Sequence, residues 1–95
     1  MNLSDEQLQQ IREMSAALMP PTEIAILLGL PPDQHDYFCD ICKNHRQTSI
    51  FNVYHQGRLQ TKYELRKTVI KLAKAGSPVA EPLADRYMKE QIINE

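Results

Sequence analysis

The segment PPTEIAILLGL, residues 20–30, decides the fold of this chain. Its Pro-Pro step ends the helix that precedes it, because proline lacks a backbone donor and restricts the residue before it. A short helix is predicted over residues 23–28, with Thr22 as its N-cap. Gly29 ends this helix in the left-handed conformation. With the small Ala25 placed where two helices must approach closely, the pattern is typical of a helix-turn-helix unit.

Helical patterns flank this segment on both sides. Before it, Ser4 and Gln7 have the spacing of a capping box, and the helix that they begin is expected to end near residues 17–19. After it, the Pro-Pro-Asp step precedes a third helix, predicted over residues 33–45. The first part of the chain therefore reads as three short helices.

The second part of the chain reads as two helices joined by a turn. A long helix is predicted over residues 50–75, although Gly57 inside it costs about 1 kcal/mol relative to alanine. Gly76 closes this helix, and the last helix covers residues 79–92. Pro82 fits only the first turn of that last helix.

We therefore predict an all-α fold with a tri-helical helix-turn-helix unit followed by a two-helix hairpin. The boundary is placed between residues 1–46 and residues 47–95. The apolar face of the long helix is about 140° wide, which is more than one partner helix covers. The uncovered part of this face indicates a contact with the tri-helical unit or with another copy of the chain. The hairpin is predicted to be a self-association region.

Composition and length exclude several classes of protein. The chain has 95 residues, of which 42% are hydrophobic and 24% are charged, close to the average of globular proteins. No apolar run reaches the length of a membrane span, and the first residues lack the basic flank of a secretory signal. We expect a protein of the cytoplasm that has no membrane partner.

The net charge of −1 conceals a strong asymmetry. Residues 1–42 contain one base and seven acids, whereas residues 43–74 contain eight bases and one acid. Such a basic segment indicates nucleic acid or an acidic partner. The two halves also have the charges to attract each other, within one chain or between copies.

The candidate DNA contacts follow from this charge distribution. The third helix carries Asp33, Asp36 and Asp40. Because phosphates repel carboxylates, this helix is expected to contact DNA bases only weakly. Base-edge contacts are predicted for Gln34 and His35, near the start of that helix. Phosphate contacts are predicted for the following basic residues: Lys43, Arg46, Arg58, Lys62 and Arg66. For the last three of these, pairing with another subunit is an equal alternative. A second basic stripe is interpreted as a solvated face: Lys67, Lys71 and Lys74.

Four segments resemble the small terminase subunits of tailed bacteriophages and related prophage proteins. They are PTEIAILLGL at residues 21–30, YHQGR at 54–58, ELRK at 64–67 and LAKAGSPVA at 72–80. The resemblance implies a helix-turn-helix protein that binds double-stranded DNA and recognises viral DNA for packaging. It also implies a ring-like homo-oligomer that regulates a large terminase subunit, an ATPase and nuclease, in the cytoplasm of a bacterial host cell.

The cysteines lie in a C-x-x-C-x-x-H motif at residues 39–45. That spacing can begin a zinc site, with His35 or His55 as a further ligand, but strong zinc signatures have two such motifs. Cys39 and Cys42 are therefore interpreted as small buried hydrophobic residues, and neither metal nor cofactor is expected.

No catalytic constellation is found in the sequence, so no enzymatic activity is predicted. Two alternatives to the DNA-packaging interpretation stay open. One is a helical protein-protein adaptor or assembly protein without DNA binding, which the acidic third helix favours. The other is a small transcriptional regulator, for which a dimer is expected.

Overall fold

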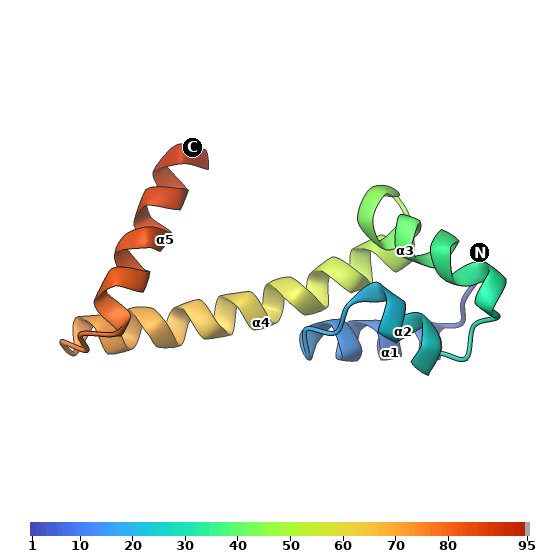
Figure 1. Ribbon diagram of the computed structural model, residues 1–95, viewed down its shortest axis with the longest axis horizontal. Coiled ribbons are helices and arrows are strands. Elements are labelled where there is room, and N and C mark those ends of the chain that lie inside the picture. The colour runs from blue at the N-terminus through green and yellow to red at the C-terminus, as the bar shows by residue number, and fades with distance from the viewer. Residues whose placement is uncertain (95) are drawn as a thin grey trace. The chain divides into compact units, whose positions relative to one another are not determined.

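The computed structural model describes residues 1–94 and shows an all-α protein, as predicted (Figure 1). No strand occurs in this range. Nor does any helix in it have the length and apolar content needed to cross a membrane. The elements in chain order are α1 (Asp5–Ala16), α2 (Pro21–Leu27), the 3-10 turn η1 (Pro32–Gln34), α3 (His35–Asn44), α4 (Ser49–Lys74) and α5 (Ala80–Asn94).

The chain divides by packing into two compact units. The N-terminal unit is Met1–Thr61, and the C-terminal unit begins at Lys62, so the division falls inside α4. The boundary predicted from the sequence lies earlier, after residue 46. The boundary between the two compact units lies later because Ile50 and Tyr54, in the first part of α4, belong to the N-terminal core.

The predicted capping box begins α1. The Ser4 hydroxyl accepts a hydrogen bond from the Gln7 backbone at 3.1 Å, and the Gln7 side chain accepts one from the Ser4 backbone at 2.9 Å. Two donors that the helix leaves unpaired are thereby satisfied. The helix ends at Ala16, just before the predicted end.

The predicted start of the second helix was wrong. Thr22 is not the cap, because α2 already begins at Pro21 with Pro20 in the cap position. Proline is well suited to the first helical position, where its fixed φ is helical and no N–H is needed. The predicted role of Gly29 is confirmed, since it has a φ of +75° and follows Leu28, the C-cap of the helix.

The third predicted helix begins later than expected. Residues 32–34 form η1, and α3 starts at His35. Its inner face joins that of α2 in a core that α1 and α4 complete. The most deeply buried side chains of this core are Ile11, Ile24, Ala25, Phe38 and Cys42.

Gly57 brings α4 into close contact with α1. A Cβ atom at this position would collide with the Ser15 hydroxyl and with the backbone of Arg12 and Ala16. Thr61 stabilises the same contact, because its hydroxyl donates a hydrogen bond to the Ala16 carbonyl. From the sequence, Gly57 was expected only to lower the stability of the helix. The structure shows that the position requires glycine because α1 leaves no space for a side chain.

The C-terminal unit contains the last part of α4, a turn at Gly76 with a φ of +90°, and α5. Pro82 lies in the first turn of α5, as predicted. Ala80 is the one buried residue among the described residues of this unit. Large apolar side chains are exposed on both helices and the turn: Tyr63, Leu65, Leu72, Val79, Met88, Ile92 and Ile93.

Replacing Gly57 with alanine tests the contact between α4 and α1. The added methyl group has no space, and overpacking of this kind costs about 1–3 kcal/mol, against a gain of about 1 kcal/mol in helix propensity. We expect Gly57→Ala to lower the free energy of unfolding, measured by urea denaturation. Gln56→Ala, an exposed neighbour on the same helix, is the control and should change stability little. A Gly57→Ala chain that is as stable as this control would contradict the contact.

Candidate functional site

The two predicted base-reading residues have different environments. Gln34 is exposed at the end of η1. His35 is half-buried, and its Nε2 atom forms a hydrogen bond with the Leu30 carbonyl at 2.8 Å. This ring nitrogen connects α3 to the loop before it, so His35 serves the fold and is poorly placed to contact a base.

Three of the predicted phosphate contacts lie in the N-terminal unit. Lys43, near the end of α3, and Arg46, in the turn after it, are both exposed. Arg58 is exposed on α4, where its guanidinium donates to the Tyr54 hydroxyl at 3.3 Å. Its Cζ atom lies 5.5 Å from the centroid of the same ring.

The outward face of η1 and α3 is acidic. Asp33, Asp36 and Asp40 are exposed there. Asp40 accepts hydrogen bonds from the Asn44 amide at 2.7 Å and from the His45 ring at 2.8 Å. These bonds, that from Asn44 above all, lower the pKa of Asp40 and keep it ionised. A face with this charge repels phosphates and opposes entry of α3 into a DNA groove.

The remaining predicted contacts, Lys62 and Arg66, lie in the C-terminal unit. Arg66 is already engaged there, because its Nη2 atom is 2.8 Å from Glu90 Oε2 and its Cζ atom is 4.1 Å from the Tyr87 ring centroid. Lys62 is exposed. The predicted site residues are thus divided between two units, and Arg66 has protein partners where a phosphate was predicted.

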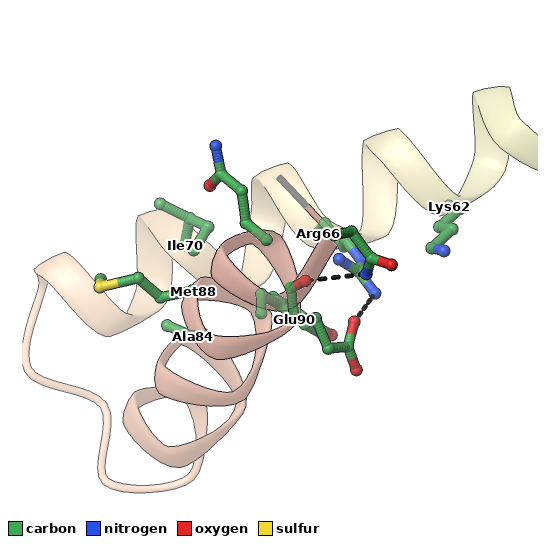
Figure 2. A pocket seen from close by; sticks show the side chains of 9 residues that line it. Lys62, Arg66, Ile70, Ala84, Met88 and Glu90 are labelled. Atoms are coloured by element: carbon green, nitrogen blue, oxygen red, sulfur yellow. Dashed lines mark hydrogen bonds and ion pairs between the residues drawn. The ribbon is translucent and has the colours of Figure 1, made fainter.

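A groove in the C-terminal unit contains this ion pair (Figure 2). Its volume is about 460 Å³. Figure 2 shows Ile70, Ala84 and Met88 gathered toward one end, with the Arg66–Glu90 pair beside them and Lys62 farther along α4. We call this feature the C-terminal groove; it is lined by Lys62, Arg66, Ile70, Ala84, Tyr87, Met88, Glu90, Gln91 and Asn94.

A stripe of three lysines is a better phosphate-binding candidate than Arg66. Lys67, Lys71 and Lys74 are exposed and recur at helical spacing on one face of α4. They lie in the last turns of the helix, where the helix dipole favours cations. The sequence interpreted this lysine stripe as a solvated face, and the structure shows all three lysines exposed, with the Lys67 Nζ atom 5.1 Å from the Tyr63 ring centroid.

The cysteine motif is placed at the interface of α3 and α4. Both cysteines were predicted to be buried. Cys42 is buried, whereas Cys39 is only half-buried. His55 Nε2 forms a hydrogen bond with the Cys42 carbonyl at 3.1 Å, and His45 contacts Asp40. Within residues 1–94, no three His, Cys, Asp or Glu side chains are grouped so that they would hold a metal ion.

Comparison with protein-family models, with curated proteins and with solved structures gives no match. The functional argument therefore depends on the charges, contacts and exposed surfaces described above. The resemblance to small terminase subunits stays a prediction from the four sequence segments.

The two cysteines are expected to differ in reactivity. Burial raises the pKa of the Cys42 thiol to about 12, so the reactive thiolate is scarce at neutral pH. A chromogenic thiol reagent at pH 8 should modify Cys39 first and Cys42 only when the chain is unfolded. Cys39→Ser should remove the early phase and Cys42→Ser the late phase. Equal rates for both thiols in the folded chain would contradict the burial of Cys42.

The Arg66–Glu90 contact is expected to depend on pH. The hydrogen bond from Arg66 lowers the pKa of Glu90 below its ordinary value. The contact is therefore complete above the ordinary glutamate pKa of about 4.3, and it is lost as the pH falls through the lowered value. Carboxyl NMR titration should show Glu90 titrating below the ordinary glutamate range, and Arg66→Gln should return it to that range. A Glu90 carboxyl that titrates in the ordinary range in the unmodified chain would contradict the ion pair.

Proposed function

We propose that this chain is a DNA-binding assembly protein that self-associates through its C-terminal unit, in the manner of a small terminase subunit. The observation that carries the proposal is that the C-terminal unit exposes two kinds of side chain. It contains both large exposed apolar side chains and the exposed lysine stripe. The first feature suits contact with another copy, and the second suits contact with phosphates.

The argument for self-association starts from burial. A pair of helices stabilises itself by covering an apolar face, and α5 leaves much of that face uncovered. Leu65 and Leu72 are 55% and 49% exposed on α4, and Ile92 is 67% exposed on α5. Surfaces of this kind mark protein-protein contacts, and identical copies supply the matching surface.

The argument for DNA binding rests on charge. Four of the proposed phosphate contacts from the sequence are exposed, namely Lys43, Arg46, Arg58 and Lys62, and the lysine stripe adds three further exposed bases on α4. The acidic face of α3 opposes base reading, so a single chain should bind the DNA backbone with little preference for sequence. Recognition of viral DNA would then require several copies, which together present it to the large ATPase–nuclease subunit.

A protein-protein adaptor is the second candidate. The acidic face at Asp33, Asp36 and Asp40 favours it, since that face suits a basic protein better than DNA. Absence of DNA binding by the assembled protein would favour this candidate. A dimer with sequence-specific binding would instead favour a transcriptional regulator.

Light scattering over a range of concentrations tests self-association. We expect a mass well above that of one 11.0 kDa chain. The double variant Leu65→Asp/Leu72→Asp should lower the mass, because two charges then occupy the exposed apolar face. Gln56→Asp adds a charge in the N-terminal unit and should leave the mass unchanged. A monomer at every concentration would refute self-association.

Fluorescence anisotropy of a random-sequence duplex at about 50 and 200 mM salt tests DNA binding, because binding that uses several bases weakens at least tenfold over this range. The triple variant Lys67→Ala/Lys71→Ala/Lys74→Ala should weaken binding to all sequences and reduce the salt slope by about one unit per lysine. Lys89→Ala is the matched control, because Lys89 pairs with Asp85 on α5 at 3.0 Å. An unchanged slope in the triple variant would remove the lysine stripe from the binding surface.

A further inference from the structure

We propose that the outer face of α2 in one copy docks into the C-terminal groove of the next copy. We call this outer face the α2 face and define it by Glu23, Ile26 and Leu27. The inference rests on the proposed self-association and names the two surfaces that meet. Because these surfaces differ, the contact is head-to-tail.

The α2 face is apolar where a short surface helix is normally polar. Ile26 and Leu27 are 64% and 63% exposed, while Ile24 and Ala25 between α1 and α3 are completely buried. Glu23 precedes the two exposed residues by three and four positions, so its carboxylate lies on the same side of the helix. The α2 face thus presents two branched apolar side chains beside one negative charge.

The C-terminal groove has the complementary chemistry. Ile70, Ala84 and Met88 provide apolar lining, and its volume of about 460 Å³ has room for branched side chains. Its lining carries two cations, Lys62 and Arg66, against one anion, Glu90, so the net charge of the groove is positive. A ligand with apolar side chains next to a carboxylate therefore matches the groove in both polarity and charge.

Charge over the whole chain favours another copy as that ligand. Residues 1–61, which carry the α2 face, contain seven acids and four bases. Residues 62–95, which carry the groove, contain five acids and seven bases. Opposite net charges attract the N-terminal unit of one copy to the C-terminal unit of another.

A head-to-tail contact has a consequence for assembly. Every copy carries one α2 face and one C-terminal groove. Two copies joined by one contact therefore still have a free α2 face and a free C-terminal groove, to which further copies can bind. Such contacts produce a closed ring or an open filament, unless two copies each dock their α2 face in the groove of the other and so close a dimer.

Two assembly variants test the proposal by complementation. The face variant, Ile26→Asp/Leu27→Asp, keeps its groove, and the groove variant, Lys62→Glu/Met88→Glu, keeps its α2 face. All four positions are exposed, so both chains should keep their helical circular dichroism. We expect each variant alone to sediment as a monomer and an equimolar mixture to form a one-to-one dimer.

The outcomes separate this inference from the proposed function. If the unmodified chain assembles and the variants keep its mass, or their mixture stays monomeric, the head-to-tail contact is refuted while self-association stands. If the unmodified chain is a monomer at every concentration, both fail. Formation of the mixed dimer supports the proposed contact, because only unlike surfaces complement each other.

A charge exchange provides a second measurement. Glu23→Lys should lower the association constant about two- to fivefold, the range expected for an exposed ion pair. Adding Lys62→Glu to the same chain should restore it, because the pair is then reversed. Glu13→Lys, at an exposed acid of α1, is the control for net charge. Equal effects of Glu13→Lys and Glu23→Lys, without restoration, would overturn the pairing.

Discussion

The N-terminal unit depends on the absence of a side chain at Gly57. Only a glycine lets the backbone of α4 lie against Ser15 and its neighbours in α1. This approach places Val53 and Tyr54 over the core formed by the three preceding helices. The long helix is therefore part of the N-terminal core as well as the connection to the C-terminal unit.

Features decided by neighbouring residues could be predicted from the sequence. The capping box at Ser4 and the left-handed Gly29 were predicted because their partners lie within a few positions along the chain. The start of α2 was not, because a proline can occupy the first helical position as well as end the preceding helix. The role of Gly57 was also missed, since its partners in α1 are far away in the sequence.

The same distinction applies to the candidate site. Composition located the basic segment, and most of its members are exposed. Two residues have partners that charge counting does not show: Arg66 pairs with Glu90, 24 positions later, and His35 is held by the Leu30 carbonyl. The acidic face of α3 was visible in the sequence and is confirmed as exposed, with Asp40 kept ionised by its neighbours.

The continuity of α4 across both units affects how the chain folds. Starting a helix is unfavourable, because several residues are fixed before the first hydrogen bond forms, whereas each later residue adds one bond. Packing of Ile50 and Tyr54 in the N-terminal core orders the first turns of α4. Residues after Thr61 then extend an existing helix and need no nucleus of their own. The C-terminal part of α4 can thus be helical, with its lysines aligned, without support from any other chain.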